Sequence, residues 1–512
     1  MRSSYRFLLL AGYAALSTND GAAQQFYFQG LGDLPGKGFW SRAEGVSADG
    51  MVVVGQSSSI NGTEAFRWTK ELSMLPLGDL PGGLFHSQAR ATSSTGEAVV
   101  GVSRSAKGDE AFRWTQTAGM VGLGDLPGTY FTSHGRGVSA DGAVVVGRAS
   151  PGEGSEAFRW TEASAMVGLG DLPGGTSESY AYGESADGSV VIGYSSGANG
   201  YEAFRWTEAS AMVGLGDLPG GPTQSRALAV SADGLVTVGW GFSFWGREAF
   251  SWTEESGMVG LGDLEGGRFA SEAVSVSGDG SVIGGWSGGY NGNEAVLWDA
   301  ERVMRPVILE LIERGIDVPV GWSLELVSGV SLVDGILTIV GYGRSPLGTE
   351  GWVAVMPWPV QVLPSSFSVL RGLRIGGGLA DLFESDDQYL LIRPWFVLTT
   401  TEAPVQVLVE GASPYDTVSE LRFVLEAGVS FPNIRQSIDL FNFQTNQWEL
   451  VDARPGTVGD TVVEVTVSMD PSRFVQPGTG LVRARLRWKE SGPILAYPWL
   501  ARIDQVGWTV MR

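Results

Sequence analysis

The chain repeats one long phrase at a fixed interval of 46 residues. GSEAFRWTEASAMVGLGDLPGG begins at Gly154, and GYEAFRWTEASAMVGLGDLPGG begins at Gly200. A catalytic site needs its residues once, so this repetition indicates architecture before chemistry. A period of this length is typical of propellers and solenoids, in which each repeat is one supersecondary unit.

Three short elements define the unit. A Gly-x-Glu element recurs at Glu64, Glu110, Glu156, Glu202, Glu248, Glu294 and, after a longer interval, Glu350. An Asp-Gly pair recurs at Asp49, Asp141, Asp187, Asp233, Asp279 and Asp334, and Thr95-Gly96 replaces it in one copy. A Gly-Asp-Leu element recurs at Asp33, Asp79, Asp125, Asp171, Asp217 and Asp263. The chain therefore has one Gly-Asp-Leu element fewer than it has units, and the first one precedes the first unit.

Each unit reads as four short strands. In the first unit these are SRAEGVS, MVVVGQS, TEAFRWT and SMLPLGDL, which begin at Ser41, Met51, Thr63 and Ser73. The Asp-Gly pair between the first two is a hairpin-turn signal. The third run alternates as a half-buried strand does, and the Leu-Pro-Gly-Gly that follows suits a type II turn.

The offset between the elements predicts a closed ring. The seventh unit stops after its third strand, EGWVAVMP, whereas a spare fourth strand lies in QFYFQGLGDL at Gln25–Leu34. We predict that this ribbon pairs with Gly351–Met356 and closes an all-β, seven-bladed β-propeller over residues 24–357. Radial closure is favoured because it leaves no long unpaired edge. An open solenoid is the alternative, and it would keep the two segments apart.

Small residues recur on the predicted first strand of each unit. They lie six positions before the Asp-Gly pair at Ala43, Ala89, Gly135, Ala181, Ala227 and Ala273, and four before it at Gly45, Ala91, Gly137, Gly183, Ala229 and Ser275. We expect this strand to be innermost, where the blades crowd around an axis. The seventh unit carries an insertion whose helical spacing predicts a short helix over 307–314.

These phrases resemble the bacterial extracellular HAF repeat. GLGDLPGG stands at Gly168–Gly175 and Gly214–Gly221, and VSADG, VVVG and GxEAFRW follow one another between Val138 and Trp160. The resemblance covers residues 25–357. Glu265 replaces the proline in one copy, and Ser251 and Leu297 replace the arginine. The resemblance implies an exported repeat protein and implies no reaction.

The last third of the chain has a different pattern. About eight alternating runs, from YLLIRPWFV to RIDQVGWTV, are separated by Pro, Gly and Asp turns. This pattern predicts a β-sandwich of jelly-roll type over residues 358–512. An outer-membrane barrel is the alternative because its strands alternate as well, although no aromatic girdles are evident.

Charge and composition exclude several classes of function. The formal net charge is −22, which disfavours nucleic acid and anionic membrane surfaces as partners. The chain has no cysteine, which excludes disulfides, thiolate metal sites and cysteine catalysis. We expect a monomer without cofactor or metal, and no transmembrane segment in the mature chain.

The N-terminus predicts export. Arg2 and Arg6 precede the apolar run FLLLAGYAALS, and Gly21-Ala22-Ala23 follows as a small-residue cleavage site. This is the pattern of a signal peptide over residues 1–23, with a secreted, cell-surface or periplasmic product. An uncleaved anchor is the alternative.

Two sets of loops are expected on one face of the propeller. The connections from fourth to first strand and from second to third strand are the segments in which the copies differ, and they are rich in aromatic residues. Such loops are typical of a binding surface, and relaxed constraint on long loops is the alternative. The predicted binding residues are Phe39, Trp40, Phe85, His86, Tyr130, Phe131, His134, Tyr180, Phe244 and Trp245.

His86 and His134 are the two histidines of the chain, and both fall on this face in adjacent blades. A metal or general-base role is one interpretation, with Arg90, Arg136 and Tyr182 lining the same mouth. The alternative is that they are ordinary polar residues, because two histidines without a third ligand do not define a metal site. The chain lacks P-loop, GxSxG and HExxH motifs.

The repeated glutamates are interpreted as structural. A group present in every blade does not single out one active site, so we expect these glutamates to join a hydrogen-bond network with the arginines at 67, 113, 159 and 205 and the Gly-Asp-Leu aspartates. The predicted function is a secreted, non-catalytic protein whose variable face binds an extracellular glycan or a surface protein. The alternative is an extracellular polysaccharide hydrolase or lyase that uses His86 and His134.

Overall fold

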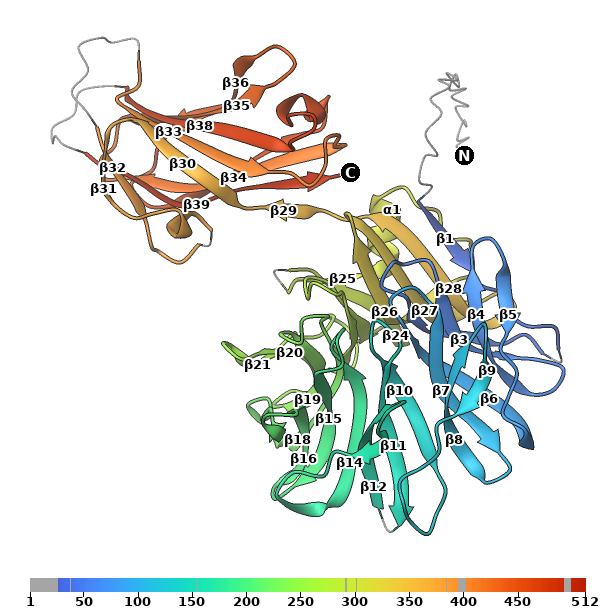
Figure 1. The fold of residues 1–512 in the computed structure, drawn as a ribbon. Coiled ribbons are helices and arrows are strands. Elements are labelled where there is room, and N and C mark those ends of the chain that lie inside the picture. The colour runs from blue at the N-terminus through green and yellow to red at the C-terminus, as the bar shows by residue number, and fades with distance from the viewer. Residues whose placement is uncertain are drawn as a thin grey trace, which may run out of the picture.

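The computed structural model describes residues 26–36, 38–152, 154–290, 292–300, 302–383, 385–394, 402–491 and 499–512. The predicted signal peptide, residues 1–23, lies outside them. The described chain is all-β apart from α1 (Val307–Glu313) and the short turns η1 (Ala380–Leu382) and η2 (Pro471–Phe474). Figure 1 shows a propeller of radiating sheets, joined by the segment that carries β29 to a second body of two sheets.

The propeller is built from four-stranded antiparallel units, six of which have their strands side by side in chain order, while the seventh takes its fourth strand from the N-terminus. Among the described residues up to Pro357 there are seven such units. They are β2 (Ser41–Val46), β3 (Val53–Ser58), β4 (Thr63–Thr69) and β5 (Ser73–Pro76); β6 (Gly82–Thr92), β7 (Ala98–Ser105), β8 (Gly108–Thr115) and β9 (Gly119–Gly122); β10 (Ser133–Val138), β11 (Val144–Gly152), β12 (Gly154–Thr161) and β13 (Ala165–Gly168); β14 (Gly174–Glu184), β15 (Val190–Gly197), β16 (Gly200–Thr207) and β17 (Ala211–Gly214); β18 (Gly220–Val230), β19 (Thr237–Ser243), β20 (Gly246–Thr253) and β21 (Gly257–Gly260); β22 (Ser271–Val276), β23 (Ile283–Gly289), β24 (Gly292–Trp298) and β25 (Met304–Pro306); and β26 (Ser323–Val333), β27 (Ile336–Ser345), β28 (Gly348–Pro357) and β1 (Tyr27–Gly30).

The N-terminal strand completes the seventh unit. β1 pairs antiparallel with β28, with Tyr27 opposite Val355 (Figure 1). The Gly32 N–H donates to Glu350 Oε1 at 3.0 Å, just as the Gly78 N–H donates to Glu64 Oε1 within the first unit. The predicted pairing is therefore confirmed, although Gln25 lies outside the described residues.

The first strands form the inner ring of the propeller. Each first strand contacts the first strand of the next unit, from β2 through β6, β10, β14, β18 and β22 to β26, and β26 contacts β2 again. This closed cycle excludes the open solenoid. The small residues predicted for the innermost strand lie there, and Ala43 and Ala89 are fully buried.

The space between neighbouring units is filled from the third strands. Phe66, Phe112 and their counterparts in the next three units are fully buried. Their rings pack against glycine on the second strand. A Cβ on Gly55 would lie 2.0 Å from the Arg42 carbonyl oxygen and 2.9 Å from the Phe66 ring, so only glycine fits this position.

The fourth strand is shorter than predicted. β5 ends at Pro76, so the Gly-Asp-Leu segment that follows is irregular rather than extended. It is held by side chains instead: the Leu80 N–H donates to Ser103 Oγ at 2.9 Å, and the Leu34 N–H donates to Ser57 Oγ at 2.9 Å. The leucine side chains are buried, which explains the apolar pattern that suggested a strand.

The helix expected in the insertion is confirmed as α1, within one residue of the predicted end. Its Val307 and Leu311 side chains are fully buried against the sixth and seventh units. Within the described part of the chain, no helix has the length and apolar character needed to cross a bilayer.

The C-terminal body consists of two facing antiparallel sheets around one core. One sheet contains β31 (Leu373–Gly376), β32 (Leu390–Arg393), β39 (Ala501–Met511), β34 (Glu420–Val429) and β37 (Thr461–Val467), and β29 (Val360–Val362) pairs with β39. The other contains β30 (Pro364–Arg371), β33 (Val405–Ala412), β38 (Leu481–Glu490), β35 (Ile434–Asn442) and β36 (Gln447–Pro455). Phe423, Trp488 and Trp508 are buried between them, which makes the body sandwich-like.

Candidate functional site

The two loop sets predicted to share a face lie against each other. In six of the seven units the turn between second and third strands packs on the segment that leads into the next unit; in the sixth, a Cβ on Gly292 would have no neighbour within 4 Å. A Cβ on Gly62 would lie 3.0 Å from the Phe85 carbonyl oxygen, and one on Gly348 would lie 2.9 Å from that of Phe39. The second of these contacts joins the seventh unit to the first, so the variable loops gather on one face around the whole ring.

The opposite face is built from near-identical turns. The Ser47 hydroxyl donates to Asp49, and the same serine–aspartate bond recurs at Ser139, Ser185, Ser231 and Ser277. Backbone bonds then link the turns of successive units, as from the Ala140 N–H to the Ala186 carbonyl at 2.8 Å. This face repeats itself and offers no single distinctive site.

The repeated glutamates and arginines are structural, but they do not form one network with the aspartates. Six of the seven glutamates hold a Gly-Asp-Leu segment: the Gly124 N–H, for example, donates to Glu110 Oε1 at 3.1 Å, whereas no such segment follows Glu294. The arginines bond to the next unit instead, as Arg113 Nε does to the Gly142 carbonyl at 2.8 Å. Asp125 accepts hydrogen bonds from backbone N–H groups of Leu126 and Thr132.

The predicted aromatic residues fall into two groups. Tyr130, Phe244 and Trp245 are more than half exposed on the loops, and the last two meet edge to face at 5.1 Å. Phe39, Trp40, Phe85 and Phe131 are only partly exposed, because the phenylalanine backbones carry the loop contacts described above. The first group is the more accessible to a partner.

Tyr180 belongs to a different place, the wall around the axis of the ring. It lies on β14 opposite Tyr194 of β15, and the two rings stack at 4.7 Å. The same cross-strand position joins His134 to Arg148 in the third unit and Arg226 to Trp240 in the fifth. These pairs are set between the constant small residues of the first strand and the constant glycine of the second.

Three positions of the unit therefore vary within strands that are otherwise nearly constant. We call the side chains at these positions the axial belt. In chain order they are Arg42, Gln88, His134, Tyr180, Arg226 and Glu272; Glu44, Arg90, Arg136, Tyr182, Leu228 and Val274; and Gln56, Val102, Arg148, Tyr194, Trp240, Trp286 and Tyr342.

The belt is continuous across the units. The Arg136 guanidinium lies 5.5 Å from the Tyr182 ring, and Arg226 lies 4.2 Å from the Tyr194 ring. Arg42 of the first unit lies 4.3 Å from the Tyr342 ring of the seventh, so the ring closure also completes the belt. Alternating cations and aromatic faces are mutually favourable contacts.

Some belt charges are paired within the protein. Arg90 forms an ion pair with Glu44 at 3.2 Å, and Gln56 Nε2 donates to the same carboxylate at 2.7 Å. Arg247, which lies 3.8 Å from the Trp240 ring, pairs with Glu272. Burial raises the pKa of Glu272, and Arg247 opposes that rise.

Arg42, Arg136, Arg148 and Arg226 have no such partner among the described residues. None of them lies within ion-pair distance of a described carboxylate or donates a hydrogen bond there. The Nε donors of Arg42 and Arg226 are buried and lack an acceptor. Burial, followed by the positive charges of Arg90 and Arg148, lowers the pKa of Arg136. The belt thus carries uncompensated positive charge in a protein of negative net charge.

The structure brings the two histidines into one neighbourhood. Burial, then Arg148 and Arg136, lowers the pKa of His134 to about 4, while Asp109 opposes the shift and Arg90 adds to it. Burial, then Arg104, lowers the pKa of His86, while Asp109 raises it and Arg90 lowers it further. Both imidazoles are therefore neutral at neutral pH. The predicted neighbours Arg90 and Arg136 belong to this same cluster.

Two other places in the described part of the chain gather polar side chains. A cavity of about 490 Å³ lies between the sixth and seventh units, lined by Glu294, Trp322, Glu325 and Arg344 among others. Its Arg344 and Glu325 pair with each other at 2.9 Å, so among its described lining residues only the carboxylate of Glu294 is outside an ion pair. The belt is the stronger site on chemical grounds.

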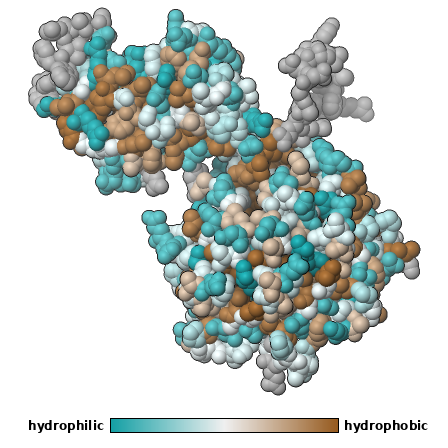
Figure 2. All heavy atoms as spheres, viewed as in Figure 1, coloured by the Kyte–Doolittle hydropathy of each residue, from teal (hydrophilic) through white to brown (hydrophobic). Residues whose placement is uncertain are grey.

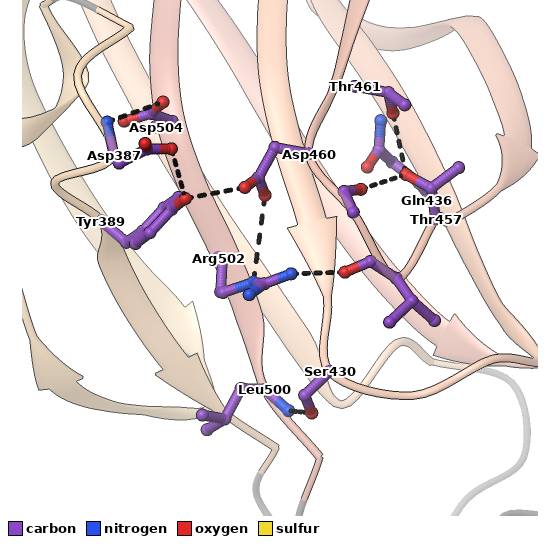
Figure 3. A network of polar contacts seen from close by, with 12 residues as sticks. Asp387, Tyr389, Ser430, Gln436, Thr457, Asp460, Thr461, Leu500, Arg502 and Asp504 are labelled. Atoms are coloured by element: carbon purple, nitrogen blue, oxygen red, sulfur yellow. Dashed lines mark hydrogen bonds and ion pairs between the residues drawn. The ribbon is translucent and has the colours of Figure 1, made fainter.

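The second place is a polar network in the C-terminal body (Figure 3). The Tyr389 hydroxyl lies within hydrogen-bond distance of two carboxylates, 2.7 Å from Asp460 and 2.8 Å from Asp387, and Arg502 lies beside Asp460. The network ties β32, β37 and β39 together at one end of the sheet, which indicates a structural role. The part of the chain that the structure describes contains no group of three or more His, Asp or Glu arranged to hold a metal ion.

Sequence reasoning missed most of the belt. The variable loops of the sequence pointed to five of the belt residues: Tyr180, His134, Arg90, Arg136 and Tyr182. They did not point to Arg42, Arg148, Tyr194, Arg226 or Trp240. The signal was present in the repeat: aligned copies differ at every second position of the first strand while the residues between them stay small.

The chain is similar to several solved structures, in each case at low sequence identity and low TM-score. No family model matches the chain, and no curated protein matches it, so the HAF resemblance stays a prediction. TolB from Acinetobacter baumannii matches at 12% identity and a TM-score of 0.36, over 50% of this chain and 62% of TolB. Sqt1 from Chaetomium thermophilum matches at 10% and 0.32, over 65% of this chain and 100% of Sqt1. Trypanosoma rangeli sialidase matches at 10% and 0.33, over 92% and 91%.

Proposed function

We propose that this chain is an exported, non-catalytic binding protein: a seven-bladed β-propeller of the HAF-repeat kind that carries a jelly-roll-like β-sandwich. Its variable face binds an extracellular glycan or a surface protein. One observation carries the proposal. The units differ in residue type at the loops of one face and at the axial belt. They keep nearly the same residues at the turns of the opposite face.

The accessible groups on that face suit binding. Phe244 and Trp245 are 74% and 71% exposed on the turn between β19 and β20, and large apolar side chains at such exposure favour contact with a partner. Figure 2 shows hydrophilic and hydrophobic residues intermixed over the visible side of the propeller, without one dominant apolar patch. Selective contacts at a few loops and at the axis fit this surface better than a broad apolar interface does.

The repeat supplies its own test variant. Phe244→Ala with Trp245→Asn gives the fifth unit the turn residues that the fourth unit has at Ala198 and Asn199, so the fold should tolerate the change. Glu208→Ala, on the opposite face, is the matched control. Residues 24–512 are screened against immobilised glycans and surface proteins, and we expect the double variant, but not the control, to lose about tenfold or more in affinity.

Two outcomes would contradict the proposal. Equal binding by both variants and by substitutions in the belt would place the partner elsewhere. Release of fragments from a polysaccharide, abolished by His86→Ala with His134→Ala, would make the protein a hydrolase or lyase instead of a binding protein.

A further inference from the structure

We propose that the axial belt binds the carboxylate of an acidic sugar, and that Arg136 and Arg148 are the residues that recognise it. The inference rests on the proposed binding function and assigns it a ligand class: a uronate-containing glycan, bound through a chain end at the axis of the ring.

Two arginines of the belt carry positive charges that the protein leaves without a carboxylate partner among the described residues. Arg136 and Arg148 are partly exposed, and among the described residues they contact aromatic rings but no carboxylate. They lie close enough to Arg90 and to each other for their positive charges to repel. A guanidinium presents a rigid fork of N–H donors that matches a carboxylate in two hydrogen bonds. A bound carboxylate would therefore relieve the repulsion and use the free donors.

The rings beside these arginines favour a sugar. Arg148 lies 5.3 Å from the Tyr180 ring, which stacks on Tyr194, and Arg136 lies on Tyr182. Glu178, on the same strand as Tyr180, accepts hydrogen bonds from the Tyr180 and Tyr201 hydroxyls, at 3.2 and 2.7 Å. A uronate suits this lining, because its carboxylate matches the arginines and its hydroxyl groups can hydrogen-bond to Glu178 and to the tyrosine hydroxyls.

The position of the belt limits how the ligand enters. The net charge of −22 repels a long polyanion laid across the surface. A chain end that reaches the axis meets the positive belt while the rest of the polymer stays in solvent. The structure thus favours terminal or short acidic oligosaccharides over internal stretches of polymer.

The test compares small ligands by calorimetry with residues 24–512. Trigalacturonate should bind, and maltotriose, which has no carboxylate, should bind at least tenfold more weakly. Arg148→Gln gives the third unit the residue found at Gln56 in the first, and Arg136→Leu gives it the residue found at Leu228 in the fifth. Each should weaken trigalacturonate binding by about tenfold to a hundredfold, the loss expected for one hydrogen-bonded charge.

The matched control is Arg104→Gln. Arg104 is exposed, is already paired with Asp109 at 3.1 Å, and lies on the same kind of strand one unit earlier. It should leave the affinity unchanged. The two histidines give a second readout by NMR: bound trigalacturonate should raise the pKa of His134 from about 4, since a negative charge enters beside Arg148 and Arg136, and should move His86 less.

Several results would overturn the inference. They are equal binding of maltotriose, undiminished binding by Arg148→Gln and Arg136→Leu, binding of acetate or phosphate as tight as that of the trisaccharide, and equally tight binding of a hexaglutamate peptide. The proposed function fails separately. If the loop variant Phe244→Ala, Trp245→Asn loses a partner that Arg148→Gln still binds, the face is a binding surface and only the belt inference is wrong.

Discussion

Leu34→Ala tests whether the N-terminal segment is an integral part of the propeller. Leu34 follows the closing strand β1, is 2% exposed, and packs in a cluster with Val340, Val353 and Val355 of the seventh unit and Phe66 of the first. Its counterpart Leu80 is 4% exposed and packs in the same way between the first and second units. The two leucines thus occupy equivalent cavities, one across the closure and one inside the continuous chain.

The expected cost follows from this equivalence. Truncation of a buried leucine to alanine typically costs about 2–5 kcal/mol, from lost transfer free energy and the cavity left behind. Since the surroundings of Leu34 and Leu80 match, the two variants should lose the same free energy of unfolding to within about 1 kcal/mol. Leu80→Ala serves as the internal standard that calibrates the value for this fold.

The assay is equilibrium unfolding in urea, followed by tryptophan fluorescence and by far-UV circular dichroism on residues 24–512. A lower midpoint at an unchanged slope would report lost stability rather than a changed denatured state. The reasoning is refuted if Leu80→Ala costs about 2 kcal/mol or more and Leu34→Ala costs less than about 0.5 kcal/mol. That result would mean that the segment does not contribute to the folded ring.

Three further predictions follow from single contacts. The Glu184 carboxyl oxygens are buried without a partner, and burial raises the pKa of Glu184 well above the usual value. The free energy of unfolding should therefore fall as the pH rises from about 4.5 towards the raised pKa. Glu184→Val introduces the residue found at Val46 and Val138; it should stabilise the protein by about 1–3 kcal/mol at pH 8 and remove this pH dependence in thermal melts. His134 has a depressed pKa of about 4, so its contribution to the free energy of unfolding is present above about pH 6.5 and is lost as the pH falls towards 4. His134→Gln, which introduces the residue found at Gln88, should flatten the plot of stability against pH in this range. An unchanged plot would count against a buried, neutral His134. Gln29 and Val353 are paired between β1 and β28 in a chain without cysteine. Gln29→Cys with Val353→Cys should form an intramolecular disulfide on oxidation, because hydrogen-bonded antiparallel partners have Cα atoms about 5.5 Å apart. Free thiols in a mass spectrum of the oxidised protein would contradict the pairing of β1 with β28.

The repeat made the fold of the first two thirds unusually predictable. A strand order, a hairpin turn and an offset of one element were enough to pair Tyr27 with a residue more than three hundred positions away, because closure of a ring has few solutions. The Gly-Asp-Leu segment was assigned wrongly because a buried leucine gives the same apolar signal in a loop as in a strand. Only the contact of Leu80 with Ser103 distinguishes the two cases.

The candidate site was less predictable for a physical reason. The alternation of residue types along β10 predicts which side chains face away from the core. It does not predict that His134 and Arg136 lie close to Arg148 of the next strand. That proximity depends on the register between β10 and β11, which includes a bulge after Gly135. The charges of the belt also cancel in pairs, as Arg90 and Glu44 do, and the sequence does not reveal which arginines remain unpaired.

The join between β1 and β28 has a consequence for how the chain acquires its structure. Strand β1 is synthesised more than three hundred residues before its partner β28, because Trp352 must be made before Gly30 can bond to it. Until then the seventh unit lacks its outer strand and presents an open edge, which invites pairing with other chains. We expect late, slow completion of folding, and a period during synthesis when a holdase that covers exposed β-edges would raise the yield.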